Sequence, residues 1–206
     1  VVRVFITANA GAPGTIAGRD QEGLSAYYLA NVADFLDRAR RRQIAVMLCT
    51  ESFPRVAPFR DTLRRPDATC DEPNASYLAA GHVEAKARFL QDLIRGLHAV
   101  SPTCLGAIFS YDLQNEFCYH GGPPFTLASG TLEAANGTTY TLPGQRQELA
   151  DDGAVYFLSR MVDAVHEVQP HALVSASVFT YAAVGRTGPG DFSVKQAAWP
   201  NRIPFR

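Results

Sequence analysis

The chain has 206 residues, of which 47% are hydrophobic and 19% are charged, and its formal net charge is −1. These values are typical of a globular protein large enough for one core, and the near-neutral charge argues against nucleic acid as a partner. No segment approaches the roughly 20 consecutive apolar residues of a membrane span, so we expect no membrane partner either.

Four β-rich runs alternate with three helical patterns along the chain. Each run is mostly continuous apolar sequence, which is typical of parallel strands covered on both faces. Each helical pattern has apolar residues at i, i+3 and i+4 spacing. In chain order, the expected elements are strand Val1–Thr7, helix Tyr28–Ala39, strand Ile44–Thr50, helix Val83–Leu97, strand Gly106–Leu113, helix Val155–Val165 and strand Ala172–Phe179. This order predicts an α/β fold with parallel strands and right-handed crossovers.

The connections between these elements are unequal in length. Links from a helix into the next strand are short. Links from a strand into the next helix are long and rich in Gly, Pro, Asn and aromatic residues, and they cover Ala8–Ala26, Glu51–Ala80 and Phe117–Asp152. Asp151 or Asp152 is expected to cap the last helix, and Pro170 to stop it. Long loops at the carboxyl ends of parallel strands are where α/β proteins carry their site.

Residues 125–143 predict a β-hairpin inserted in the third long loop, because two alternating runs flank Asn136-Gly137. The hairpin could be a wall of a substrate site or decoration. The first long loop argues against a dinucleotide-binding fold, since Gly11 and Gly14 lack the GxGxxG spacing, and no P-loop is present. A (β/α)8 TIM barrel remains, of which four strands are about half. We therefore expect residues 1–206 to form a single domain that is part of an incomplete barrel.

The stretch IFSYDLQNEFCYH, residues 108–120, carries polar side chains where a buried strand is expected to end. Because side chains alternate along a strand, Asp112, Gln114 and Glu116 share one face with Ser110. In a barrel that face points inward, which would bury the Glu116 carboxylate at the mouth. A buried carboxylate has a raised pKa and can act as a general acid. The alternative is that Glu116 caps a loop amide or pairs with an arginine.

The segment YDLQNEF after an apolar run resembles the fourth strand of clan-A retaining glycoside hydrolases, (β/α)8 barrels that include the family 5 cellulases and mannanases. The resemblance implies that Glu116 is the acid/base and that Asn115 holds the sugar 2-hydroxyl. Asp112 matches a carboxylate common four residues before the catalytic Glu. The opening VVRVF is similar to the family's second strand, which makes Arg3 the arginine beside the nucleophile. The resemblance covers most of Val1 to Thr180, as strands two to five.

The chain departs from the family pattern in three places. Phe117 stands where a proline usually follows Asn-Glu, and the third strand ends in Thr50-Glu51 where the cellulases often have histidine. The third departure is the nucleophile, a Glu ending strand seven, because nothing after Phe179 predicts another strand with a carboxylate. A retaining mechanism needs two carboxyl groups about 5–5.5 Å apart. We expect either that the chain is a piece of a longer protein or that it is no longer an enzyme alone.

Aromatic side chains in the long loops are candidate platforms for sugar rings, with ordinary loop packing as the alternative. The substrate-binding candidates among them are Tyr119, His120 and Trp199, alongside Asn115 and Arg3. The expected activity is that of a retaining β-glycoside hydrolase on a β-linked polysaccharide or oligosaccharide. The alternatives are a non-catalytic carbohydrate-binding or structural barrel fragment, and a complete small α/β protein of another class.

Four cysteines lie at positions 49, 70, 104 and 118, and none forms a CxxC pair. We therefore expect no metal site and no cofactor. The cysteines form two disulfides or remain four buried thiols. Cys49 and Cys118 could come close at the ends of neighbouring strands, and the competing pair is Cys70 with either of them. The chain opens on VVRVFITANA with no signal peptide, which processing could have removed. A secreted or periplasmic location is favoured over a cytoplasmic one.

Overall fold

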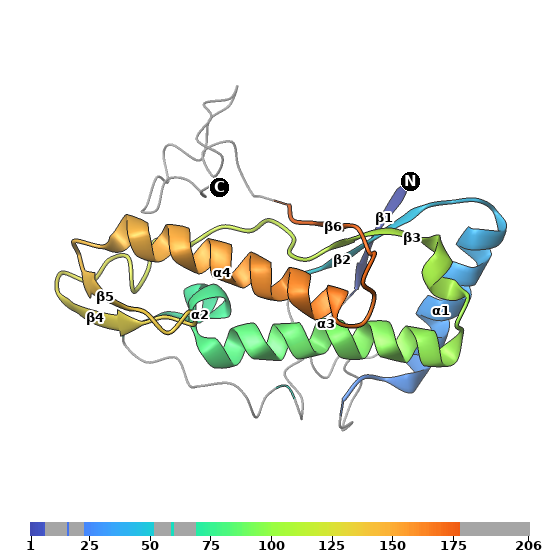
Figure 1. Cartoon of the computed structure of the whole chain (residues 1–206), viewed down its shortest axis with the longest axis horizontal. Coiled ribbons are helices and arrows are strands. Elements are labelled where there is room, and N and C mark those ends of the chain that lie inside the picture. Colours follow the sequence, from blue (N-terminus) through green and yellow to red (C-terminus); the bar gives the residue numbers. More distant parts are fainter. Residues whose placement is uncertain (7–15, 17–22, 52–58, 60–68, 178–206) are drawn as a thin grey trace. The chain divides into compact units, whose positions relative to one another are not determined.

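The structure is a computed structural model, and it describes residues 1–6, 16, 23–51, 59 and 69–177 (Figure 1). The chain is mixed α/β. Its elements are β1 (Val2–Ile6), α1 (Ala26–Arg41), β2 (Val46–Thr50), α2 (Glu72–Leu78), α3 (Ala80–Val100), the 3-10 turn η2 (Cys104–Ala107), β3 (Ile108–Asp112), β4 (Gly130–Glu133), β5 (Thr139–Leu142), α4 (Arg146–His166) and β6 (Val174–Ser175). None of the described helices combines the length and the apolar character needed to cross a membrane.

Strands β1, β2, β3 and β6 form one sheet in that order, and every neighbouring pair is parallel (Figure 1). The predicted parallel arrangement of the four β-rich runs is therefore confirmed. The described strands lie in the sheet in the same order as in the sequence. In a doubly wound sheet this spatial order would reverse. These strands do not close into a barrel, so the sheet is the established part of the architecture and the barrel stays a prediction.

The chain divides into two compact units. The first contains Val1–Leu63, Ala85–Asn115 and Met161–Ser177, and it holds the parallel sheet. The second contains Arg64–Glu84, Glu116–Arg160 and Val178–Arg206, and it holds the hairpin. Helices α3 and α4 each run through both units. The prediction that residues 1–206 form a single barrel domain stays a prediction.

Helix α1 forms where the apolar spacing predicts it. The Ser25 hydroxyl accepts the Tyr28 backbone N–H at 3.3 Å and caps the first turn. Leu29 is buried on the inner face of the helix and packs closely against α3. A Cβ at Gly96 of α3 would lie 2.8 Å from Leu29 Cδ1, so the Leu29 side chain packs directly onto the glycine and would have to shift for a larger residue.

Two helices differ from the sequence prediction. Helix α4 begins at Arg146, so Asp151 and Asp152 lie inside it and the predicted cap at these residues is wrong. Gly153 lies inside the helix against Leu78, whose side chain would have to shift for any larger residue, because a Cβ there would lie 2.4 Å from Leu78 Cδ2. Helix α2 lies in a stretch predicted as loop. Its N-cap is Asp71, whose carboxylate accepts the Asn74 N–H at 3.0 Å.

The second unit contains an antiparallel hairpin of β4 and β5. Asn136 shapes its turn by accepting the Thr138 N–H at 3.0 Å, and Gly137 supplies the positive φ of 76°. The strands bring Tyr140 and Leu142 into the core of this unit. The other buried members of that core are Cys70, Ala75, Leu78, Phe125, Ala134, Leu149 and Ala150. The hairpin is therefore packed into its unit through its own apolar side chains.

Candidate functional site

One face of the parallel sheet is polar. Cys49 on β2 lies opposite Asp112 on β3, and Met47 lies opposite both Arg3 and Ser110. Residues opposite each other in neighbouring strands project to the same side, so these five side chains share a face. The other face carries the fully buried Val46, Leu48 and Tyr111. The polar face therefore carries the side chains of a candidate site, which lies near the carboxyl ends of β2 and β3.

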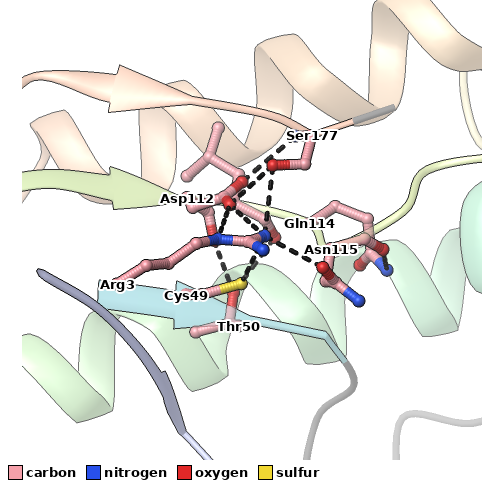
Figure 2. A network of polar contacts seen from close by, with 8 residues as sticks. Arg3, Cys49, Thr50, Asp112, Gln114, Asn115 and Ser177 are labelled. Atoms are coloured by element: carbon pink, nitrogen blue, oxygen red, sulfur yellow. Dashed lines mark hydrogen bonds and ion pairs between the residues drawn. The ribbon is translucent and has the colours of Figure 1, made fainter. Parts of the chain in front are cut away.

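Arg3 and Asp112 form the centre of the site (Figure 2). The guanidinium Nε and Nη2 of Arg3 both donate to Asp112 Oδ2, at 3.0 and 2.5 Å. The Arg3 side chain is 34% exposed, whereas Asp112 is fully buried. Burial alone would lower the pKa of Arg3, but the hydrogen bond and the negative charge of Asp112 outweigh it and raise the pKa. Arg3 therefore remains a cation that neutralises a buried carboxylate.

The rest of the network also converges on Arg3 (Figure 2). Its Nη2 lies 3.1 Å from Cys49 Sγ, 2.9 Å from Asn115 Oδ1 and 3.1 Å from Ser177 Oγ. Nη2 carries only two hydrogens, so Asp112 and these three acceptors share them. The guanidinium carbon also lies 4.7 Å from the ring centroid of Phe5, which is 48% exposed. A cation over an aromatic face is an attractive contact that holds the Arg3 side chain in place.

Asp112 receives two further hydrogen bonds from Ser177, just beyond β6. The Ser177 N–H donates to Oδ1 at 3.1 Å, and its hydroxyl donates to Oδ2 at 2.8 Å. Charge-assisted hydrogen bonds of this kind compensate the desolvation of a buried carboxylate. Asp112 therefore ties the first strand of the sheet to the last one.

Asn115 is fixed through both its backbone and its side chain. Its N–H donates to the Thr50 carbonyl at the end of β2, at 3.1 Å. The Thr50 hydroxyl donates in turn to the Leu113 carbonyl, at 3.0 Å. Because Arg3 donates to the Asn115 amide oxygen, the amide nitrogen Nδ2 is turned away and has no hydrogen-bond partner among the described residues. Asn115 is thus a preoriented donor.

The Cys49 thiol is not a nucleophile at neutral pH. Burial, followed by the negative charge of Asp112, raises its pKa to about 12, although Arg3 acts in the opposite direction. The thiolate is the reactive form of cysteine, and it is scarce at neutral pH with such a pKa. Cys49 therefore serves the site as a buried neutral contact for Arg3.

Glu116 differs from what strand alternation predicts. Strand β3 ends at Asp112, and Gln114 is still buried, but Glu116 is exposed. Its φ of 48° lies in the left-handed region, which ends the extended backbone on which alternation depends. The expectation of a buried Glu116 is therefore wrong, and the buried carboxylate of this stretch is Asp112.

The three aromatic candidates lie in different settings. Tyr119 packs in the second unit, with its ring centroid 5.0 Å from that of Phe125 and 5.5 Å from that of Phe117. Its hydroxyl donates to the Ala150 carbonyl at 3.1 Å, and burial raises its pKa well above the ordinary value. Tyr119 thus has a packing role in the structure. His120 is exposed, and Trp199 lies outside the described residues.

Cys49, Cys104 and Cys118 are free thiols, so the pairing considered between Cys49 and Cys118 is not formed. Cys70 is buried. Among the residues that the structure describes, no group of three or more His, Cys, Asp or Glu side chains is placed to hold a metal ion.

Sequence reasoning missed three residues of the site region. Ser177 and Phe5 lie in runs predicted as strands, but nothing in those runs marks their contacts to Asp112 and Arg3. The third is Lys86 on α3, which is 2% exposed and donates from Nζ to the Glu51 carbonyl at 3.0 Å. The signal for Lys86 was its position three residues after Val83 on an apolar helix face.

Searches against protein-family models, curated proteins and solved structures find no match for this chain. The arrangement itself provides an oriented amide donor and an ion pair between a fully buried carboxylate and a partly exposed guanidinium, near the carboxyl ends of β2 and β3. These groups are suited to binding and orienting a polar ligand.

Proposed function

We propose that this chain is part of a retaining β-glycoside hydrolase that acts on a β-linked polysaccharide or oligosaccharide. In this proposal Glu116 is the acid/base, and Asn115 binds the sugar 2-hydroxyl. The observation that carries the proposal is the hydrogen bond from Arg3 Nη2 to Asn115 Oδ1, at 2.9 Å. This bond selects one of the two orientations of the amide and leaves its NH₂ group for a ligand.

An oriented amide donor is useful to a glycosidase for a physical reason. Hydrogen bonds to the sugar 2-hydroxyl strengthen as the ring approaches the oxocarbenium-like transition state, so a fixed donor lowers the barrier. Asn115 is fixed at its backbone by Thr50 and at its side chain by Arg3, as a preorganised donor must be. The Arg3 guanidinium, held by buried Asp112 and still one-third exposed, adds a positive charge for the nucleophile that we expect outside this chain.

Glu116 follows Asn115 directly in the chain, and its exposure leaves the carboxyl group accessible to substrate. As acid/base it protonates the departing glycosidic oxygen and then removes a proton from the attacking water. The second carboxylate forms the covalent glycosyl intermediate. The family resemblance implies a nucleophile on a strand beyond the four that are described.

The stereochemistry of the first product tests the proposal. The protein that contains this chain and the nucleophile strand is mixed with β-linked gluco- and manno-oligosaccharides, and the anomeric proton is followed by NMR. A retaining enzyme releases the β-anomer first, whereas release of the α-anomer would refute the mechanism. Binding without hydrolysis would instead support a non-catalytic carbohydrate-binding protein. If the protein neither binds nor hydrolyses these oligosaccharides, both the hydrolase proposal and the carbohydrate-binding alternative are refuted.

A further inference from the structure

Lys86 is a buried lysine on the apolar face of α3. The chain has only two lysines, Lys86 and Lys195. Lys86 is 2% exposed and lies one helical turn from Val83 and from Leu90, both fully buried. An ammonium group inside a protein costs free energy unless it is paired, so a lysine at such a position calls for an explanation.

The amine of Lys86 binds the end of strand β2. Its Nζ donates to the carbonyl oxygen of Glu51, the residue after the strand, at 3.0 Å. The same nitrogen lies 5.9 Å from the ring centroid of Phe89, on the next turn of the helix. The titratable groups that act on the amine are Cys49 in β2, Glu51 just after β2 and Asp112 in β3, and of these Glu51 and Asp112 are carboxylates. Burial is the largest influence and lowers the pKa of Lys86 to about 7, although the two carboxylates favour the ammonium form.

Three consecutive residues at the end of β2 connect this amine to the candidate site. Cys49 Sγ contacts Arg3, the Thr50 carbonyl accepts the Asn115 N–H at 3.1 Å, and the Glu51 carbonyl accepts from Lys86. Thr50 therefore lies between the residue that Lys86 holds and the residue that contacts Arg3. A shift of the Glu51 peptide moves the Thr50 carbonyl, because neighbouring peptide planes share a Cα atom.

We propose that Lys86 is a positioning residue of the candidate site, whose amine holds the end of β2 so that the Thr50 carbonyl seats Asn115. The role in sugar binding rests on the proposed function, whereas the link from Lys86 to Asn115 does not. The ammonium form binds the Glu51 carbonyl through a charge-assisted hydrogen bond, and the neutral amine binds it more weakly. The seating of Asn115 therefore changes when Lys86 gains or loses its proton.

NMR on the full chain tests the proposal without any ligand. The lysine ¹³Cε resonances report both amines, and the Lys86→Met variant assigns the signal of Lys86. We expect the Lys86 signal to titrate with a midpoint far below the ordinary lysine value of 10.5. The backbone amide resonance of Asn115 should titrate with the same midpoint, and this titration should vanish in Lys86→Met.

Amide hydrogen exchange provides the second readout. In Lys86→Met the Asn115 amide should exchange about tenfold faster than in the wild type, the effect of weakening one hydrogen bond, while the amides of β1 and β3 keep their protection. The matched control is Leu93→Met, which alters a fully buried α3 residue without a polar contact and should leave the Asn115 amide unchanged.

Two results would overturn the inference. One is an Asn115 amide resonance that does not shift when Lys86 titrates in the wild type. This result refutes the positioning role even if Lys86→Met fails to fold. The other is equal loss of protection across the whole sheet in Lys86→Met, because this would show general destabilisation. If the NMR results hold but the wild type binds no sugar, the glycosidase proposal fails and the positioning role of Lys86 stands.

Discussion

Arg3 and Asp112 are 109 residues apart in the sequence, yet two nitrogens of the Arg3 guanidinium donate to one carboxylate oxygen of Asp112. The parallel order β1-β2-β3 places one strand between them, and the long Arg3 side chain spans it. Asp112 is fully buried, so Arg3 supplies the counter-charge that permits a carboxylate at that position. The pair also orients Asn115, and it is therefore the structural basis of the proposed site.

Replacing Arg3 by methionine should destabilise the fold. The buried Asp112 carboxylate would keep the two hydrogen bonds from Ser177 but lose its counter-charge, and removing one partner of a buried ion pair costs about 3–5 kcal/mol. We expect the low end of that range, because Arg3 is partly exposed. Urea denaturation measures the loss. The control is Arg38→Met, which breaks an exposed i,i+4 pair with Asp34 and should change stability by less than about 0.5 kcal/mol. Equal effects of the two variants would contradict the account.

Asn115 variants separate stability from sugar binding. Asn115→Asp keeps an oxygen for Arg3 but loses the NH₂ donor, so it should fold as stably as the wild type and bind oligosaccharide about tenfold more weakly. Asn115→Ala loses both contacts and should show the same weakening, with a small loss of stability. Calorimetric titration gives the affinities. Full binding by Asn115→Asp would show that the amide donor does not contact the ligand.

The cysteines should react with a thiol reagent in a fixed order. Cys118 is partly exposed and should react first, although burial followed by the charge of Glu116 raises its pKa. Cys49 and Cys104 are fully buried, with pKa values raised by burial to about 12 and about 11. They should react at least about a thousandfold more slowly than in urea, because labelling then requires opening of the fold. Mass spectrometry of labelled peptides gives the order, and fast labelling of Cys49 would contradict its burial.

Lys86 should make the protein more stable as the pH rises above 7. Its folded-state pKa of about 7 lies below the ordinary 10.5, so between these values the unfolded chain binds a proton that the folded chain does not. The free energy of unfolding then increases with pH, by up to about 1.4 kcal/mol per pH unit. Below pH 7 the amine is charged in both states, and the folded state bears the full cost of the buried charge.

The measurement is urea denaturation at several pH values between about 7 and 8.5. Above about pH 9 the thiols of Cys49 and Cys104 ionise first in the unfolded chain, because burial raises their folded-state pKa values, and stability then declines. Lys86→Met should remove the rise within the lower window. A wild-type stability that is flat over this window would show that Lys86 keeps an ordinary pKa.

The sheet could be predicted because its signal is local and repeated. Each expected β-rich run contains an observed strand. A helix lies between each pair of successive runs, and helical crossovers connect parallel strands. The start of α4 was misplaced because Asp151 and Asp152 resemble caps, and Gly153 resembles a break. The helix continues through these residues, and the close approach of Leu78 to Gly153 is a tertiary feature that the local sequence does not show.

The site was predicted in part. Asp112 and Asn115 lie at or just beyond the carboxyl end of β3, Arg3 lies within β1, and the structure brings the three side chains together. The orientation of Glu116 could not be predicted. The alternation of side chains ends where φ becomes positive, and the residue type at position 116 does not indicate a positive φ. Lys86 follows Val83 on the apolar face of its helix, but lysine is rarely buried, so the residue type argues against the position. Its burial depends on a carbonyl 35 residues away in the sequence.

The kinetics of Glu116→Gln test the central claim most directly. The variant, made in the protein that includes the nucleophile strand, should bind sugar normally but lose most turnover. The loss should be smaller for substrates whose leaving groups need no proton, and azide should restore part of the second step by attacking the glycosyl-enzyme without a general base. Equal losses on all substrates, no response to azide and a lower melting temperature would contradict the assignment and show that Glu116 is structural.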